Sequence, residues 1–285
     1  MTEESSPAMM PERATSEENP VPRSVEMAGG IPSRKYCLFD TSVLVPYFLP
    51  RAHKDALVHE RAAIIIESVR SGQAQHFFYI PNFCIAEVFS TFAKYAYGDW
   101  NKQVKARTID GRVHASFRKQ FQTDIHNATL FYHYELSRYH VLTVNLVAPV
   151  DHYFKLGRGD GRRIVPSGTF DQLIAAMGIH LTKIHGAGNV VVVTADNRLA
   201  KLIRKCRSPI SATARKTMKI ADAERFVGIP FQADSFPLVL DLATAKDRDL
   251  QAVFGEWPLP VAGRYKRPCH LKRKRAAPPR EKTKD

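Results

Sequence analysis

Short apolar runs alternate with helical stripes of apolar residues along most of this 285-residue chain. The runs have the length and character of strands buried on both faces, and they are Tyr36–Phe39, Phe77–Ile80, Val190–Val193 and Leu238–Leu240. Apolar residues at helical spacing predict helices over about 54–70, 83–97, 169–184 and 197–204. Strands that alternate with helices form βαβ units, so we predict an α/β fold: a three-layer α/β/α arrangement with a central parallel sheet.

The two ends and the middle of the chain depart from this pattern. Residues 1–33 carry six acids and two bases and are predicted to be a disordered acidic tail. Residues 264–285 carry ten bases and two acids and are predicted to be a disordered basic tail. The domain between them spans 34–263. A basic segment at about 99–168 is predicted to be a mostly helical insertion, with a long helix around Phe117–Tyr139 and a loop rich in Gly and Arg at 157–163.

The charge and composition of the chain narrow the classes of function that it could have. The formal net charge of +14 favours a polyanionic partner, most simply nucleic acid, over a basic protein whose charges are only solvated. No apolar run is long enough to span a membrane, and the first thirty residues lack the basic-then-apolar order of a secretory signal, so we expect neither a membrane span nor export. Four scattered cysteines form no CxxC pair, which indicates reduced thiols and a cytoplasmic protein. A phosphate-binding GxxxxGK[ST] loop is also absent from the sequence, which excludes a P-loop NTPase.

Four acidic residues stand beside the predicted strands and helices. Asp40 follows the first strand, Asp196 follows the Val190–Val193 strand, Glu87 lies early in a helix that follows a strand, and Asp171 opens the helix over 169–184. Each alone has a simpler explanation, as a helix cap, a turn or a solvated residue. Together they are predicted to gather at the carboxyl ends of the strands, where parallel sheets bind ligands.

Clustered carboxylates repel one another, and a divalent cation relieves that repulsion. Carboxylate oxygens are hard ligands that suit Mg²⁺ or Mn²⁺, whereas zinc prefers His or Cys, for which no ligand spacing is present in the sequence. An acidic metal site within a basic protein suits hydrolysis of a phosphodiester. A haloacid-dehalogenase-type phosphatase also begins with Asp after a strand, but Ser42 occupies the position of its required second Asp.

The segments around these acids resemble the four motifs of PIN-domain ribonucleases, the fold of VapC-type toxins. They are Cys37-Leu38-Phe39-Asp40-Thr41-Ser42, Ile85-Ala86-Glu87-Val88, Phe170-Asp171-Gln172-Leu173 and Val193-Thr194-Ala195-Asp196. The resemblance implies a metal-dependent endoribonuclease in which Asp40, Glu87, Asp171 and Asp196 bind one or two Mg²⁺ or Mn²⁺ ions. A metal-activated water would then leave a 5′-phosphate and a 3′-hydroxyl. Ser42 and Thr194 would orient these groups through their hydroxyls, although local turn bonding explains both residues equally well.

The resemblance also implies partners. RNA is the expected substrate, and a homodimer and an antitoxin-like protein inhibitor are candidate assemblies, although the separation of 84 positions from Glu87 to Asp171 exceeds the spacing in compact toxins. The basic segment would bind RNA through Lys102, Lys105, Arg107, Arg112, Arg118 and Lys119. Alternatively, these residues form a solvated helical face. The alternative function is a non-catalytic RNA-binding module on the same fold, which would not need the acidic residues.

Overall fold

A computed structural model describes residues 34–48, 56–97, 111–128, 130–154 and 166–262 of the chain. Its centre is a five-stranded sheet with the strand order β3-β2-β1-β4-β5, in which every neighbouring pair is parallel. The strands are β1 (Tyr36–Phe39), β2 (Phe77–Pro81), β3 (Phe131–Tyr134), β4 (Val190–Thr194) and β5 (Leu238–Asp241). The predicted parallel sheet is confirmed.

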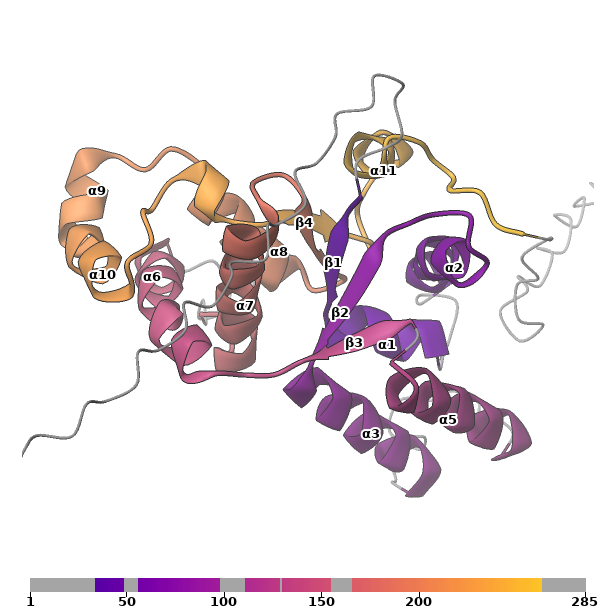
Figure 1. Cartoon of the computed structure of the whole chain (residues 1–285). Coiled ribbons are helices and arrows are strands. Elements are labelled where there is room, and N and C mark those ends of the chain that lie inside the picture. The colour runs from indigo at the N-terminus through magenta and orange to yellow at the C-terminus, as the bar shows by residue number, and fades with distance from the viewer. Residues whose placement is uncertain (1–33, 49–55, 98–110, 129, 155–165, 263–285) are drawn as a thin grey trace, which may run out of the picture. The chain divides into compact units, whose positions relative to one another are not determined.

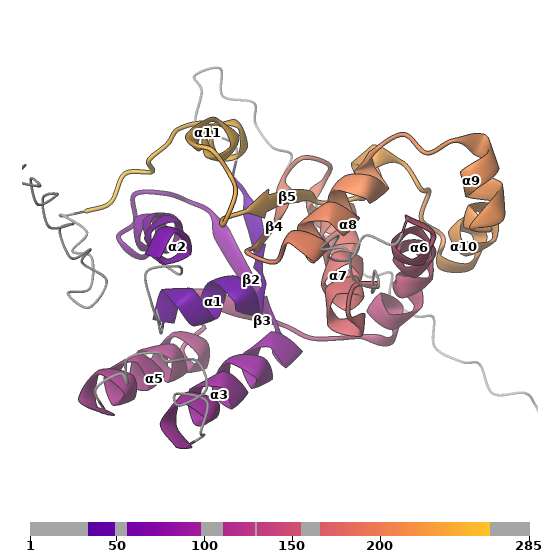
Figure 2. The ribbon, with the colours of Figure 1, turned by 180° about the vertical axis from the view of Figure 1, so that it is seen from behind.

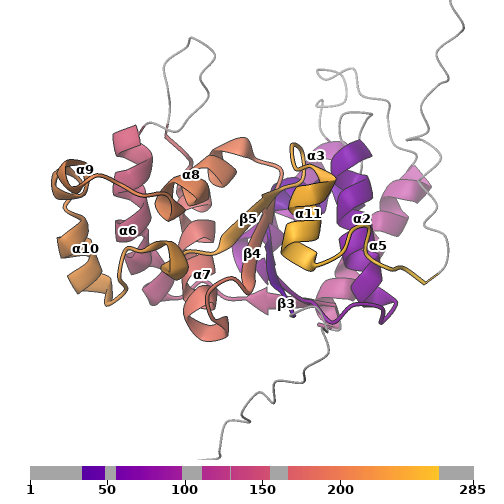
Figure 3. The ribbon, with the colours of Figure 1, turned by 90° about the horizontal axis from the view of Figure 1, so that it is seen from above.

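Helices cover both faces of the sheet, which confirms the three-layer α/β/α fold (Figures 1 and 3). One face carries α1 (Thr41–Phe48), α2 (Ala56–Arg70), α3 (Asn82–Tyr97) and α5 (Gly111–His126). The other face carries α6 (Arg138–Phe154), α7 (Thr169–His185) and α8 (Asn197–Arg207). Figure 2 shows the same two groups from behind, with α9 (Ala212–Thr217) and α10 (Ile220–Val227) beside α6. The short η2 (Ala233–Ser235) precedes β5, and α11 (Asp247–Phe254) follows it.

The connections make β1 the point at which the strand order reverses. From β1 the chain proceeds outward through β2 to β3, and it then returns to place β4 on the other side of β1. The backbone amide of Asp40, just past β1, donates to the carbonyl of Val193 in β4 at 3.0 Å. The carboxyl ends of β1 and β4 therefore lie side by side, and parallel α/β sheets bind ligands at such a reversal.

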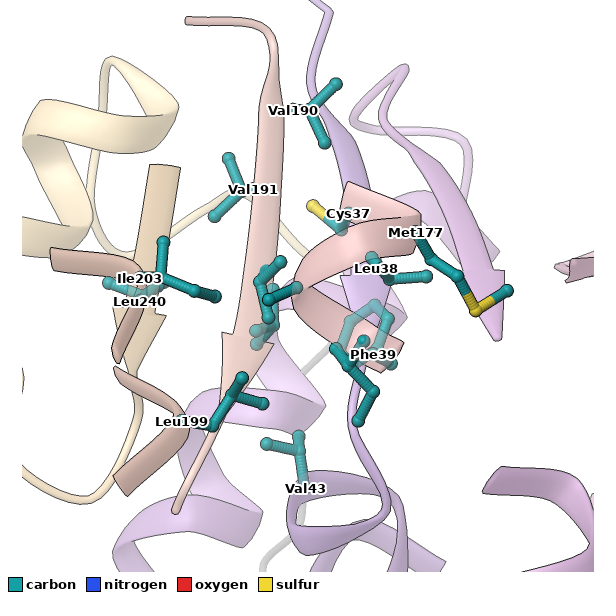
Figure 4. Packing of buried hydrophobic residues seen from close by; sticks show 14 of the residues in the cluster. Cys37, Leu38, Phe39, Val43, Met177, Val190, Val191, Leu199, Ile203 and Leu240 are labelled. Atoms are coloured by element: carbon teal, nitrogen blue, oxygen red, sulfur yellow. The ribbon is translucent and has the colours of Figure 1, made fainter. Parts of the chain in front are cut away.

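The core explains why the strands are so apolar. Val190 to Val193 of β4 are fully buried, as a strand covered on both faces must be. Figure 4 shows Val190 and Val191 of this strand among the side chains of the core. On the α1 side, the ring of Phe39 meets that of Phe78 edge to face, with centroids 5.1 Å apart. On the α7 side, the helix lies so close to its neighbours that a Cβ on Gly178 would stand 2.7 Å from Cγ of Pro237. Only glycine permits this packing.

The predicted helix around Phe117–Tyr139 is confirmed only as far as His126. Helix α5 ends at His126, Ala128 adopts a left-handed backbone with φ of 49°, and the aromatic run Phe131–Tyr134 then forms β3 beside β2. Aromatic residues favour the pleated surface of a sheet over a helix. Helix α6 lies within the segment predicted to be mostly helical, although no separate helix was predicted over its residues, and it contains Pro149. Residues 99–168 therefore contribute a strand and a covering helix to the central architecture as well as the helical segment that was expected.

Several predictions lie outside the described residues: those for the two tails, 1–33 and 264–285, and that for the loop at 157–163. Within the part of the chain that the structure describes, no helix combines the length and apolar character needed to cross a membrane.

Candidate active site

Asp40 occupies the carboxyl end of β1, and its side chain is only 7% exposed. Its Oδ2 accepts hydrogen bonds from the hydroxyls of Thr194, at 2.8 Å, and Ser42. Helix α1 begins at the next residue, and the main-chain carbonyl of Asp40 accepts from Val43 and Leu44. No backbone amide in the described residues donates to the Asp40 carboxylate, so this side chain is not serving as the helix cap that its position before Thr41 would allow.

Thr194 and Ser42 connect β1 to β4. The Ser42 hydroxyl also accepts from the amide of Ala195 at 2.8 Å, and the Thr194 hydroxyl accepts from the amide of Asp196 at 2.9 Å. The two hydroxyl oxygens lie 3.2 Å apart. These bonds fix the carboxylate of Asp40 against the turn that carries Asp196. The geometry is that of an orienting pair, and the proposed role of both residues stays a prediction.

Asp196 lies at the end of β4, where it caps α8. Its Oδ1 accepts from the backbone amide of Arg198 at 2.7 Å, and its Oδ2 pairs with the Arg198 guanidinium at 3.0 Å. The simpler explanation for this acid was an ordinary turn at Asp196-Asn197, and in the structure Asp196 is instead the N-cap of α8. Asp196 also acts on the site electrostatically, because its negative charge raises the pKa of Asp40.

Glu87 lies in the second turn of α3, which follows β2. Its Oε2 accepts from the hydroxyl of Thr41 at 2.6 Å, so that Glu87 is tied to the residue directly after Asp40. The negative charge of Glu87 also raises the pKa of Asp40. The second acid of the sequence pattern is thus adjacent to the first in space.

Asp171 lies in the first turn of α7, where its Oδ2 accepts from the amide of Gly168 at 3.2 Å. The start of α7 lies beside the start of α3, since the rings of Phe170 and Phe83 stack with centroids 5.2 Å apart. Asp171 precedes its strand in the sequence, yet this contact brings it to the same edge of the sheet as the other acids. The charges of Asp196 and Asp40 act on it there.

Burial and neighbouring negative charges disfavour the ionised forms of Asp40 and Asp171. Burial raises the pKa of Asp40 above its ordinary value, against the two hydroxyl hydrogen bonds, and the charges of Asp196 and Glu87 raise it further. Burial, Asp196 and Asp40 raise the pKa of Asp171 to about 6, while the nearby Arg198 lowers it. Groups at one site whose pKa values are displaced by burial and by each other are typical of functional sites.

Carboxylates and hydroxyls at this edge are the ligand types that a hard cation takes, but they do not form a closed site as they stand. Among the residues that the structure describes, no three His, Cys, Asp or Glu side chains are arranged to hold a metal ion. The three outer acids each accept a hydrogen bond from a local donor: Glu87 from Thr41, Asp171 from Gly168, and Asp196 from Arg198. A cation would have to compete with these donors.

Three residues of this region escaped the sequence analysis. Thr41 and Arg198 bind Glu87 and Asp196, and each lies within two residues of a predicted acid, which is the only signal that the sequence offers. Asp151 of α6 is fully buried and accepts from the amide of Ser167, at 2.8 Å, and from the amide nitrogen of the Gln172 side chain, at 3.0 Å. It therefore anchors the start of α7, next to Asp171. Nothing in its sequence context marks it.

The predicted RNA-gripping residues are placed only in part. Arg118 and Lys119 lie on α5 and are exposed, and Arg112 lies in the first turn of the same helix. Lys102, Lys105 and Arg107 lie outside the described residues.

Comparison with known proteins gives no relative: no protein-family model, curated protein or solved structure matches this chain. The resemblance to PIN-domain ribonucleases therefore depends on the four motifs alone.

Proposed function

We propose that this protein is a metal-dependent endoribonuclease whose Asp40, Glu87, Asp171 and Asp196 hold Mg²⁺ or Mn²⁺ and act on RNA phosphodiester bonds. One observation carries the proposal: the buried Asp40 carboxylate is fixed by two hydroxyls at the reversal of the strand order and interacts electrostatically with other acids of the set. Burying a carboxylate among like charges costs free energy that a purely structural site has no reason to bear.

The residues of the chain divide the work among them. Ser42 and Thr194 fix Asp40, and Thr41 fixes Glu87. Arg198 favours the ionised form of Asp171, which is the form that binds a cation. The bound cation would supply activation of water and stabilisation of negative charge at the phosphate.

The charge of the chain favours RNA as the substrate. A net charge of +14 attracts a polyanion. The acids at the carboxyl edge of the sheet would then interact with a phosphate of the RNA through a bound cation. An antitoxin-like inhibitor, a homodimer and a cytoplasmic location stay predictions from the sequence.

The second candidate is a non-catalytic RNA-binding module on this fold. One observation favours it: no three of the described His, Cys, Asp and Glu side chains converge on a metal position. Under this alternative the acids would serve as caps and turn formers, as Asp196 does for α8.

Cleavage of end-labelled structured RNA decides between the two candidates. The wild type, Asp40→Asn and the control Asp222→Asn, which alters an acid on the surface of α10, are compared with Mg²⁺, with Mn²⁺ and with chelator. Metal-dependent cutting by the wild type and the control, lost in Asp40→Asn, supports the nuclease. Tight RNA binding by all three proteins, with no cutting under any metal, supports the binding module.

A further inference from the structure

The sheet face that α7 covers carries a row of aromatic side chains beyond the edge of that helix. Tyr36 of β1 is in register with Phe77 of β2, and Tyr79 of β2 with Tyr132 of β3, so these four rings point to the same face. The centroids of Phe77 and Tyr79 are 4.8 Å apart, and those of Tyr79 and Tyr132 are 5.7 Å apart. We call these four residues, together with His185, the aromatic strip.

The strip is only partly covered. Tyr132 is 51% exposed, and Tyr36, Phe77 and Tyr79 are half-buried, whereas Phe78 and Phe131 on the opposite face are buried. Helix α7 reaches the strip with its last residue, where the His185 ring stacks on Tyr36 with centroids 3.6 Å apart. Nε2 of His185 also lies 2.9 Å from the Tyr79 hydroxyl oxygen. The rings are thus held in place while Tyr132 remains open to a ligand.

Positive charge borders the strip. The exposed Arg34 places its guanidinium 5.6 Å from the ring centroid of Tyr36 and 5.5 Å from that of Phe77. Arg34 is the cation that supports this site, because Nζ of Lys183 lies 5.8 Å from the ring centroid of Tyr139 and Nζ of Lys35 donates to the carbonyl of Gly188. One exposed acid, Glu135, follows β3. Aromatic faces beside cations are the surface that unpaired nucleotides recognise, since bases stack on the rings and phosphates meet the cations.

We propose that the aromatic strip binds unpaired bases of single-stranded RNA by stacking, with Tyr132 as the open ring and Arg34 contacting the backbone. The choice of RNA rests on the proposed function, but the strip does not require the carboxylates. A second copy of the chain fits this face less well, because self-association would bring two chains of net charge +14 together. The same charge favours a polyanion.

The test measures the binding of a short fluorescein-labelled oligouridine by fluorescence anisotropy in chelator. Tyr132→Ala is expected to weaken binding by about tenfold, the loss of one stacked base, and Tyr132→Phe, which keeps the ring, is expected to bind as the wild type does. The control Phe226→Ala removes an aromatic ring that is 61% exposed on α10 and should bind normally. Tyr132 is an exposed side chain, so its removal should leave the fold intact.

Salt dependence separates stacking from charge. Tyr132→Ala should leave the slope of log affinity against log salt unchanged, whereas Arg34→Ala should reduce that slope by about one. A duplex of the same length should bind the wild type and Tyr132→Ala equally, because its bases are already stacked on one another.

Two results would overturn the strip. One is equal oligouridine affinity of Tyr132→Ala and Phe226→Ala. The other is sedimentation of the wild type as a dimer that Tyr132→Ala dissociates, which would assign the face to a second copy of the chain. Binding is measured without metal, so the two proposals can fail separately. If the wild type cuts RNA but Tyr132→Ala binds oligouridine normally, only the proposed role of the strip is refuted. If binding depends on Tyr132 but no RNA is cut, only the proposed nuclease activity is refuted.

Discussion

Replacing Asp40 with Asn should stabilise the protein in chelator at pH 8. Burial and two neighbouring acids disfavour the charge of Asp40, while two hydroxyls bind the same oxygen, Oδ2. The amide oxygen of Asn can accept both of those hydrogen bonds, so that the substitution removes the charge and keeps the acceptor. Burial of a carboxylate costs several kcal/mol, and hydrogen bonds to a charged group return about 1.5–3 kcal/mol each.

The neutral amide keeps hydrogen bonds of about 0.5–1.5 kcal/mol each, so the substitution loses only roughly 2–3 kcal/mol of hydrogen-bond strength. Relief of the burial cost of several kcal/mol exceeds that loss, and we expect Asn to be favoured by about 1–2 kcal/mol. Such a gain raises the melting temperature of a domain of this size by about 2–8 °C. The sign depends on pH. The folded-state pKa of Asp40 is raised, so its ionised form is penalised only above the unfolded-state value of 3.8, and the penalty grows until pH exceeds the folded-state pKa. Thermal unfolding in chelator should therefore show the largest gain at pH 8 and little effect at pH 4.

Divalent cation should reverse the order of the two proteins. Saturating Mg²⁺ is expected to stabilise the wild type by mass action and to leave Asp40→Asn almost unchanged. A destabilisation by Asp40→Asn of equal size at pH 4 and pH 8, in chelator, would refute the reasoning, because it would show that the carboxylate stabilises the fold as a structural acceptor.

Three further predictions concern the same edge of the sheet and its support. With a raised pKa of about 6, Asp171 must lose its proton to bind a cation, so RNA cleavage at subsaturating Mg²⁺ should fall as pH drops through about 6 in a pH–rate profile. Arg198→Gln removes a cation that lowers the pKa of Asp171, so the same profile should shift to higher pH, and an unshifted profile would contradict the role given to Arg198. Loss of the half-exposed ion pair between Arg198 and Asp196 should lower the free energy of unfolding, measured by urea titration, by less than about 1 kcal/mol. Gly178→Ala should destabilise the fold by about 1–3 kcal/mol in the same titration, since the new Cβ would meet Pro237 at 2.7 Å, and unchanged stability would show that α7 can move away.

The fold was accessible from the sequence where hydrophobic periodicity is strong. The valine run of β4 and the apolar stripe of α7 predict their own structure, because β4 is buried along its whole length and α7 is buried over its middle turns. Periodicity fails where segments are short or interrupted. Helix α1 has eight residues and contains Pro46, and β3 begins five residues after the end of α5, with a left-handed backbone at Ala128. Tertiary pairing with β2 decides the conformation there.

The four acids of the candidate site could be named from the sequence, but the hydrogen bonds that each acid makes could not. The positions of the acids near the ends of strands follow from the alternation of strands and helices, which the sequence displays. The partners depend on which side chains meet across elements, as when Thr41 of α1 reaches Glu87 of α3, 46 residues away. The buried Asp151 was missed for the same reason. It accepts a hydrogen bond from the amide of Ser167, which precedes α7, and no periodic pattern in the sequence indicates this contact.

The central claim is that the four acids form one divalent-cation site, and a Mn²⁺ titration followed by electron paramagnetic resonance of the free ion tests it most directly. The account predicts that the wild type and Asp222→Asn remove Mn²⁺ from solution at pH 8, that Asp40→Asn does not, and that lowering the pH below about 6 releases the ion as Asp171 gains its proton. Equal Mn²⁺ binding by the wild type and Asp40→Asn, or no binding by either, would contradict it.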